Sequence, residues 1–464
     1  MLESAKKNLN YVFNPRSVAV IGASRDPGKV GHIILQNYID GGYSGRLYPV
    51  NNKAVDQIMG LKAYKSVKDI KSEIDLAVIA VPAVAVPQVL TECGQAGVKG
   101  AVVVSGGFAE VGEKSLQDEI VEIAHKYGIA MIGPNCLGVM DPKSRIDTLF
   151  LPTYKLSRPK IGGVSFVSQS GAVGSTVLDM IAKEGFGIAK FISYGNAADV
   201  DEVDILDYLM HDKDTKVIVM YIEGVKRGKE FIEIAKKLTR LKPVVVIKGG
   251  ITSEGATAAH SHTASIAGDY EMYDAVFRQF GFAVAEDLSE LLHFAKVFDS
   301  ESLPNGERVA IITNGGGTGV LTTDEVYING LKLSDFSDVT KKELRKKMPP
   351  IVNIRNPLDI AGDADAKRYG DALDSIMNDE NVDMVVAIVL FQTPGADSTV
   401  VNKLIEYKEN AKKPMIAIST GTDYTQVHKT MMESAGLPVY DSPAAAIRSL
   451  RILLDYAKYL KGLE

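Results

Sequence analysis

Residues 17–24 read SVAVIGAS, a short apolar run that ends in glycine and small residues. Such a run is typical of a buried parallel strand that leads directly into a helix N-terminus. The pattern recurs in GRLYPVNN (45–52), DLAVIAVP (75–82), GAVVVSGG (100–107) and AMIGPN (130–135). Helix-like segments such as VPQVLTECGQAG (86–97) lie between these runs. Strands that alternate with helices predict βαβ units and a parallel sheet.

The pattern of a strand followed by glycine returns twice further along the chain. It opens GGVSFVSQSGAVGSTVLDMIAKEG (162–185) and ERVAIITNGGGTGVLTTDEVYING (307–330). The spacing of these two openings is that of whole domains and is far too long for a solenoid repeat. Polar, weakly periodic segments at 141–160 and 299–307 indicate the junctions. We therefore expect an α/β protein with three doubly wound parallel-sheet domains, bounded at 1–142, 143–300 and 301–464.

Composition excludes several classes of protein. The chain has 464 residues and a net charge of −6, so no general affinity for nucleic acid or an anionic membrane is expected. Its 2 cysteines, Cys93 and Cys136, are too few for a disulfide framework or a cysteine-based zinc site. The N-terminal MLESAKKNLNYVFNP has no apolar signal core, and no apolar run is long enough to span a bilayer. We expect a cytoplasmic protein with no metal site of its own.

The first glycine loop, IGASRDPGKVG (21–31), differs from a dinucleotide-binding loop. That loop requires G-x-G-x-x-G and an acidic residue about 20 positions later, which holds a ribose hydroxyl. Here Ser24 replaces the second glycine, and the next strand ends in Asn51, Asn52 and Lys53. A cation suits a phosphate, and loop amides at a helix N-terminus suit a diphosphate. The loop predicts an anion site that is not NAD-like, with a ligand-free structural turn as the alternative.

The two later glycine loops could also bind anions at the start of a helix. In VSQSGAVG (167–174), Ser168 and Ser170 offer hydroxyls and Gly171 allows close approach to the start of a helix, so a single phosphate fits. TNGGGTG (313–319) also opens a helix, but no Gly-Lys-Ser/Thr follows, so it is not a P-loop. Each loop alone also fits an ordinary strand–helix turn.

The stretch AAHSHTASIAG (258–268) contains 2 of the 7 histidines among small residues. We expect a surface loop that is free to move. Its histidine could be a solvated loop residue, a general base, or a nucleophile that carries a phosphoryl group. Upstream, KVIVMYIEGV (216–225) places Glu223 near the carboxyl end of a strand. This carboxylate could fix the tautomer of an imidazole, or it could be an ordinary exposed acid.

Seven motifs in order resemble one family. They are SVAVIGAS, GPNCLG (133–138), VSQSGA, YIEG, SHTASIAG, NGGGTG and NPLDIAGDAD (356–365). Together they resemble the ADP-forming acyl-CoA synthetases of the succinyl-CoA synthetase superfamily, over nearly the whole chain. The length is similar to that of the separate α subunit of the acetyl-CoA synthetase (ADP-forming) type. The resemblance implies a Rossmann-like CoA-binding domain at 1–142, then two flavodoxin-like ligase domains, of which the first carries a phosphohistidine loop.

The resemblance also implies an activity. Acyl-CoA, expected to be acetyl-CoA, reacts reversibly with ADP and phosphate to give free acid, CoA and ATP through an acyl phosphate and a phosphohistidine. The family's histidine matches His262 and its supporting carboxylate matches Glu223, whereas the motif does not select His260. Ala264 stands where the family usually has glycine. If that position needs a positive φ, an alanine there would be strained.

The remaining expected site residues follow from the same match. For CoA they are Gly22, Ala23, Ser24, Arg25, Lys29, Asn51, Asn52, Lys53, Val81, Pro82, Ser105, Gly106 and Asn135. For phosphate they are Ser168, Gln169, Ser170, Gly171, Asn314, Gly315, Gly316, Gly317, Thr318 and Gly319.

The chain shows no ATP-grasp pattern. In the family that the chain resembles, an ATP-grasp module binds the nucleotide and Mg²⁺. The resemblance therefore implies that ADP/ATP and Mg²⁺ bind a separate β subunit with an ATP-grasp domain, in an α2β2 heterotetramer. The alternative is a non-catalytic CoA-binding or regulatory protein of the same fold, which would need neither His262 nor Glu223. An NAD(P)-dependent dehydrogenase is disfavoured by the first glycine loop.

Overall fold

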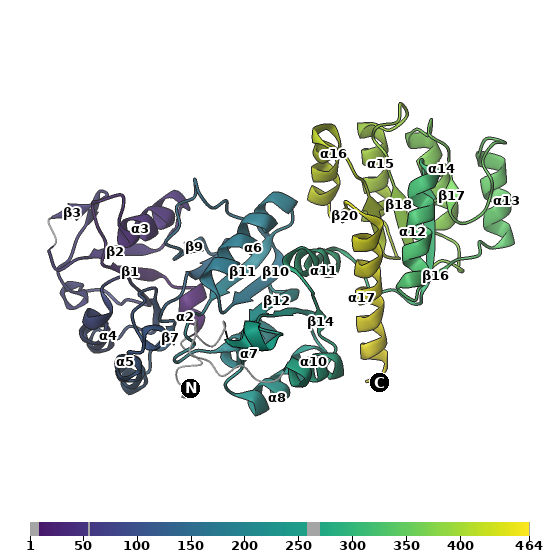
Figure 1. The fold of residues 1–464 in the computed structure, drawn as a ribbon. Coiled ribbons are helices and arrows are strands. Elements are labelled where there is room, and N and C mark those ends of the chain that lie inside the picture. The colour runs from purple at the N-terminus through teal and green to yellow at the C-terminus, as the bar shows by residue number, and fades with distance from the viewer. Residues whose placement is uncertain (1–8, 54–55, 258–269, 464) are drawn as a thin grey trace. The chain divides into compact units, whose positions relative to one another are not determined.

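The computed structural model describes residues 9–53, 56–257 and 270–463 (Figure 1). The chain divides into two compact units. One comprises Met1–Lys183 and Gly187–Phe280, and the other comprises Glu184–Phe186 and Gly281–Glu464. Within the described ranges, no helix has both the length and the apolar character needed to cross a bilayer.

The first sheet of the first unit lies within the predicted apolar runs. Its order is β2-β1-β5-β6-β7, and every pair of neighbours is parallel. The strands are β1 (Ser17–Ile21), β2 (Arg46–Val50), β5 (Leu76–Ile79), β6 (Gly100–Val103) and β7 (Ala130–Ile132). The helices are α2 (Asn10–Phe13), α3 (Val30–Asp40), α4 (Val86–Gln95) and α5 (Lys114–Tyr127), and β3 (Gln57–Ile58) pairs with β4 (Leu61–Lys62).

Helices cover both faces of this sheet. Apolar residues of α4 and α5, such as Leu90 and Ile120, share one buried cluster with Ala19, Ala77 and Val103 of the strands. Figure 1 shows α3 on the opposite side of the sheet from α4 and α5. The chain leaves β1 toward β2 on one side and returns to β5 on the other. In such a doubly wound sheet the crevice at the carboxyl ends of these strands is the place where ligands bind.

The second sheet of this unit combines parallel and antiparallel strands. Its strands within the unit are β8 (Gly138–Asp141), β9 (Ile146–Asp147), β10 (Ile161–Ser168), β11 (Ile188–Ser193), β12 (Val217–Ile222) and β13 (Val244–Lys248), in the order β13-β12-β10-β11-β8-β9. The pairs from β13 to β11 are parallel. β8 and β9 form an antiparallel hairpin on β11, so the sheet is not purely parallel as expected. The helices are α6 (Gly171–Glu184), α7 (Glu202–His211), α8 (Gly228–Leu238) and α10 (Tyr270–Gln279).

The second unit is built around a third, parallel sheet. Its order is β16-β15-β18-β19-β20, with β17 beside β15. The strands of the unit are β14 (Ala283–Val284), β15 (Arg308–Thr313), β16 (Lys332–Leu333), β17 (Leu358–Asp359), β18 (Met384–Ile388), β19 (Met415–Ile418) and β20 (Val439–Tyr440). The helices are α11 (Leu288–Ser300), α12 (Gly316–Ile328), α13 (Asp338–Lys347), α14 (Ala366–Ile376), α15 (Ser398–Glu409), α16 (Asp423–Ser434) and α17 (Pro443–Lys461). Residues of α13, α14 and α15 share one core cluster with the sheet, and α12 packs against α17.

The three sheets repeat one topology. The orders β2-β1-β5-β6, β11-β10-β12-β13 and β16-β15-β18-β19 each place the second strand outside the first and the later strands on the other side. The predicted fold class, an α/β protein with three doubly wound sheets, is therefore confirmed, whereas the domain bounds at 142 and 300 remain a prediction. Each of the three glycine loops follows the first strand of this repeated pattern, which is β1, β10 or β15, where a ligand crevice is expected.

Candidate functional site

The first cavity lies at the carboxyl ends of β1, β2 and β5 and has a volume of about 760 Å³. The predicted residues that line it are Gly22, Ser24, Lys29, Asn51, Asn52, Lys53, Val81 and Pro82. Asn51 donates from Nδ2 to the carbonyl of Ala23 at 2.7 Å, and its Oδ1 accepts from the Lys53 amide at 2.8 Å. These bonds link the end of β2 to the first glycine loop.

Five predicted CoA residues do not line this cavity. Ala23 is fully buried. Arg25 donates from Nε to the carbonyl of Gln57 at 2.9 Å, and Ser105 donates from Oγ to the carbonyl of Val81 at 2.6 Å. Gly106 and Asn135 lie close to each other elsewhere, since a Cβ on Gly106 would be 3.1 Å from Oδ1 of Asn135. Asn135 lines the second cavity, described below.

Sequence reasoning missed one side of the first cavity. Lys65, Ser66, Gln88 and Glu92 also line it. Glu92 accepts from Ser66 Oγ at 2.6 Å and from Gln88 Nε2 at 3.1 Å, so these polar side chains are held together. Lys65 joins Lys29 and Lys53 around the space, and three ammonium groups suit a ligand with several phosphates. No motif marks Lys65; its segment could be found only through its position after β2.

Two glycines bring the start of α3 close to β1. Gly22 has a φ of +93°, and a Cβ there would lie 2.2 Å from the carbonyl oxygen of Ala80. A Cβ on Gly31 would lie 2.0 Å from the carbonyl oxygen of Gly22. Only glycine fits at such distances, so these positions set the shape of the anion-binding loop.

A second cavity of about 350 Å³ lies at the start of α6. It is lined by the predicted residues Asn135, Gln169, Ser170 and Gly171, and by the apolar Val104, Leu137, Phe150, Leu151 and Ala172. Ser170 Oγ accepts from the Val173 amide at 3.3 Å in the first turn of the helix. Ser168 is fully buried and donates from Oγ to the carbonyl of Ser170 at 2.7 Å. Its hydroxyl hydrogen therefore stabilises the loop.

Gln169 joins this loop to the end of β12. Its Oε1 accepts from the backbone amides of Glu223 and Gly224, and its Nε2 donates to the carbonyl of Gly224 at 3.0 Å. The side-chain amide is thus occupied by backbone groups, and Gln169 orients Glu223 relative to the helix start.

The carboxylate of Glu223 is buried, with 5% of the residue exposed. Oε1 accepts from Tyr221 Oη at 3.2 Å. Oε2 is buried and has no hydrogen-bond partner among the described residues. Because a buried carboxylate oxygen is costly when unsatisfied, Oε2 is a ready acceptor for an N–H group that enters the site. His260, His262 and Ala264 lie outside the described residues.

The third glycine loop lies in the second unit. Gly316, Gly317, Thr318 and Gly319 form the first turn of α12, and Gly315 is its N-cap. Asn314 donates from Nδ2 to Thr393 Oγ1 at 2.9 Å and accepts from the Leu390 amide at 2.9 Å. The side chain of Asn314 therefore fixes the loop, and the amides of the first turn remain as anion donors.

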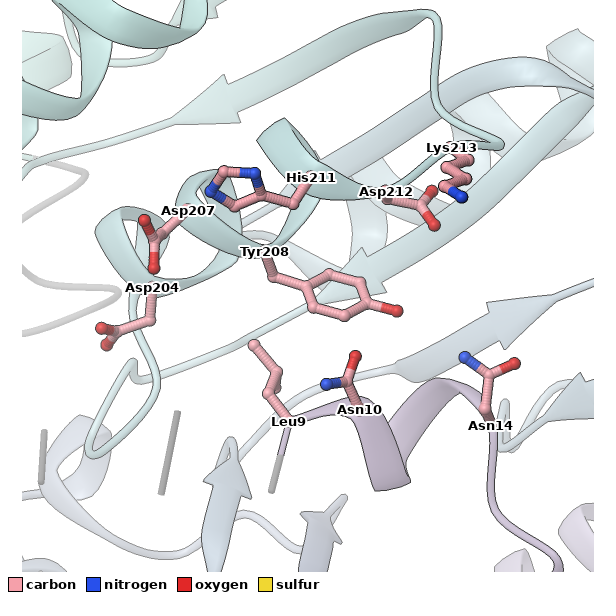
Figure 2. A pocket seen from close by; sticks show the side chains of 9 residues that line it. All are labelled: Leu9, Asn10, Asn14, Asp204, Asp207, Tyr208, His211, Asp212 and Lys213. Carbon is pink, nitrogen blue, oxygen red and sulfur yellow. The ribbon is translucent and has the colours of Figure 1, made fainter. Parts of the chain in front are cut away.

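A further cavity of about 400 Å³ lies between α2 and α7 (Figure 2). Three carboxylates, Asp204, Asp207 and Asp212, line it together with His211 and Lys213. None of the predicted site residues lies there, and its acidic character disfavours a phosphate ligand. Within the described ranges, no group of three His, Cys, Asp or Glu residues is arranged to hold a metal ion.

Comparison with known proteins gives the class. The CoA binding domain matches residues 16–142, the succinyl-CoA ligase like flavodoxin domain matches 161–298, and the ligase-CoA domain matches 309–425. A fold with a CoA-binding domain and two ligase domains of this type defines an acyl-CoA ligase.

Relatives over the full chain give the family. The acetate–CoA ligase [ADP-forming] II subunit alpha of Pyrococcus furiosus is 41% identical, over 98% of this chain and 99% of the relative. The acetate–CoA ligase [ADP-forming] of Methanocaldococcus jannaschii is 40% identical, over 98% of this chain and 66% of the relative. The chain belongs to the ADP-forming acyl-CoA synthetase family, which confirms the predicted family and enzyme class.

A solved structure has the same fold over nearly the whole length. It is the dinucleotide-forming acetyl-coenzyme A synthetase 1 of Ca. Korarchaeum cryptofilum in complex with phosphate and ADP. It matches with a TM-score of 0.91 and 37% identity, over 98% of each chain.

Proposed function

We propose that this chain is the α subunit of a cytoplasmic acetate–CoA ligase that makes ATP from acetyl-CoA, ADP and phosphate. A second subunit with an ATP-grasp domain binds ADP and Mg²⁺, and the assembly is α2β2. The names and lengths of the relatives support this division. The Pyrococcus relative is a subunit alpha that this chain covers to 99%, whereas the chain covers only 66% of the Methanocaldococcus ligase.

The proposed reaction has three steps. A phosphate oxygen attacks the thioester carbon, the C–S bond breaks, and the CoA thiolate takes up a proton, which leaves acetyl phosphate. A ring nitrogen of His262 attacks phosphorus, the P–O bond to the acetyl group breaks, and acetate leaves. The terminal oxygen of ADP then attacks the phosphohistidine and the P–N bond breaks, which gives ATP and restores the histidine.

The observation that carries this proposal is the arrangement of Glu223 beside the start of α6. Its buried Oε2 has no partner in the described part of the chain and can accept the N–H of a neutral imidazole. That bond fixes the tautomer, leaves the other nitrogen free to attack, and stabilises the cationic ring. The loop of Ser170 and Gly171 supplies a helix N-terminus for the phosphate, which contributes roughly 0.3–2 kcal/mol. On the second unit, the glycine-rich start of α12 is proposed separately as a phosphate-binding helix end.

Labelling tests the phosphohistidine directly. The complex of the chain with its partner subunit is incubated with γ-labelled ATP and Mg²⁺, and the label is mapped under alkaline conditions, where phosphohistidine is stable. His262→Asn should abolish labelling and turnover, and His260→Asn should leave both largely intact. Glu223→Gln should keep the fold but lower turnover by about 10²–10⁴-fold. Label that persists in His262→Asn and disappears in His260→Asn would assign the role to His260. Label that persists in both variants would exclude the mechanism for this loop.

The partner requirement is tested separately. The purified chain alone should form no ATP from acetyl-CoA, ADP and phosphate, because its nucleotide site lies on the other subunit. Addition of the partner subunit should restore turnover. Robust ATP formation by the chain alone would contradict the proposed division of sites.

A further inference from the structure

A buried lysine lies next to Glu223 and has no role in the mechanism above. Lys248 is the last residue of β13 and pairs in register with Ile222 of β12, which directly precedes Glu223. Only 6% of Lys248 is exposed. Burying an ammonium group is costly unless an anion or several acceptors compensate it, so this position requires an explanation.

The described contacts of this ammonium leave donors unused. Lys248 Nζ donates to the carbonyl of Gly249 at 2.5 Å and lies 5.0 Å from the ring centre of Tyr273. An ammonium group has three N–H donors, and a carbonyl and an aromatic face do not neutralise its charge. Gly249 also adjoins Tyr221 Oη, which donates to Glu223, so all of these groups share one end of the sheet.

The neighbouring cations are already occupied. Lys226 Nζ donates to the carbonyls of Asn196 and Ala197 at 2.9 and 3.1 Å. Arg227 donates from Nε to Asp201 at 2.6 Å and pairs with Asp204 at 2.6 Å. Among the described residues, Arg227 has carboxylate partners, whereas Lys226 and Lys248 have none at salt-bridge distance. Lys226 has two carbonyl acceptors there, and Lys248 has one.

The proposed chemistry needs such a cation. A phosphoryl group brings negative charge to a site that already holds the Glu223 carboxylate, and two buried anions repel each other. A helix N-terminus supplies only about half a positive charge. A full positive charge that is fixed before the reaction would stabilise the transferred group.

We propose that Lys248 is a phosphoryl-binding residue of this site, whose ammonium offsets the charge of the phosphoryl group beside Glu223. This role rests on the proposed function and adds a residue to it. Among the described residues, the titratable groups near the ammonium are Glu223 after β12, Tyr221 within β12, and Tyr273 on α10.

The role predicts a dependence on pH. Burial lowers the pKa of Lys248, and the charge of Glu223 opposes this by raising it. The ammonium form is therefore lost at a lower pH than in an exposed lysine. Turnover should fall on the alkaline side as the pH rises through this lowered pKa. Lys248→Arg keeps its charge across that range, so its alkaline decline should move to higher pH.

The test is steady-state kinetics of the complex with its partner subunit, with phosphate as the varied substrate. Lys248→Met should lower kcat/KM for phosphate by about 10- to 100-fold, the effect expected for a lost hydrogen bond to a charged group. Lys248→Arg should recover part of this loss and show the shifted alkaline limb. Lys242→Met is the control. Lys242 is a partly buried lysine whose pKa is also lowered by burial, but it precedes β13 and donates to the carbonyls of Leu209 and Asp212. It should keep the wild-type kinetics.

The outcomes distinguish the proposed role of Lys248 from the proposed function of the chain. Wild-type kcat/KM for phosphate in Lys248→Met, with labelling still dependent on His262, would overturn the role of Lys248 and leave the proposed function standing. Labelling that survives His262→Asn would overturn the proposed function itself. If Lys248→Met does not fold, Lys248→Arg decides, and an unshifted alkaline limb in that variant would overturn the role.

Discussion

The side-chain amide of Gln169 accepts the backbone N–H of Glu223 and so joins the loop before α6 to the end of β12. The same amide also bonds both backbone groups of Gly224. The residue that follows the phosphate-loop strand thus sets the position of the carboxylate proposed to orient the histidine.

Gln169→Met should therefore lower turnover without changing the affinity for CoA. Methionine has a similar length but accepts no strong hydrogen bond, so two buried backbone amides lose their acceptor at a cost of about 1–3 kcal/mol each. Turnover of the complex should fall by about 10²-fold, the loss expected when a catalytic group is misplaced by about 1 Å. CoA affinity, measured by calorimetry, should be unchanged. Gln36→Met, which removes only an exposed bond to Asp40, is the control. Normal turnover in Gln169→Met would show that the link is dispensable.

The sequence was sufficient to predict most parallel strands and to place several predicted residues at one edge of the first sheet. Apolar runs such as 17–24 and 75–82 became parallel strands because their residues are buried on both faces. Gly22, Lys53 and Pro82 line one cavity because carboxyl ends of neighbouring parallel strands meet at one edge.

Side chains that depend on tertiary contacts could not be assigned. Gln169 sits in a phosphate motif, yet its amide is used by the backbone of a strand more than 50 residues later. The contact of Arg25 with CoA stays a prediction, and the bond from its Nε to the carbonyl of Gln57 is indicated by no motif. Lys65 and Lys248 belong to no motif, and only the fold brings them to the first cavity and to Glu223. The antiparallel β8–β9 hairpin was missed because its strands are too short to show periodicity.

CoA binding should depend on the lysines around the first cavity. Lys53→Ala and Lys65→Ala should each weaken CoA binding by about 2- to 5-fold, and the affinity of the wild type should fall as salt rises, since charge pairing is screened. Lys68→Ala removes an exposed lysine that does not line the cavity and should have no effect. Calorimetry on the full chain measures all three variants. Binding of NAD in place of CoA would contradict the assignment of this cavity.

Gly31 should tolerate no side chain. The Cβ of Gly31→Ala would lie 2.0 Å from the carbonyl oxygen of Gly22, so the start of α3 must move away from the anion-binding loop. We expect a loss of about 1–3 kcal/mol of stability from this overpacking and a more than tenfold loss of CoA affinity. Gly28→Ala is the matched control, because its Cβ would lie 3.4 Å from Asp26 Oδ1, which is ordinary contact. Thermal unfolding and CoA calorimetry read out both effects, and equal behaviour of the two variants would refute the argument.

Glu202 should make the stability of the chain depend on pH. Burial, and next the charge of Asp201, raise the pKa of this carboxyl to about 7. The folded state therefore binds a proton that the unfolded state has released, and this stabilisation is present at low pH and lost as the pH rises through about 7. Between pH 5 and pH 8 the loss amounts to about 2 kcal/mol.

Glu202→Gln has no proton to lose, so its free energy of unfolding should fall less over that range than that of the wild type. Denaturant unfolding at both pH values measures how much the free energy of unfolding changes with pH in the wild type and in the variant. Glu233→Gln is the control, because Glu233 forms only an exposed pair with Lys236 and should leave the pH dependence unchanged. The same pH dependence in Glu202→Gln and wild type would mean that the Glu202 carboxyl stays ionised in the folded chain.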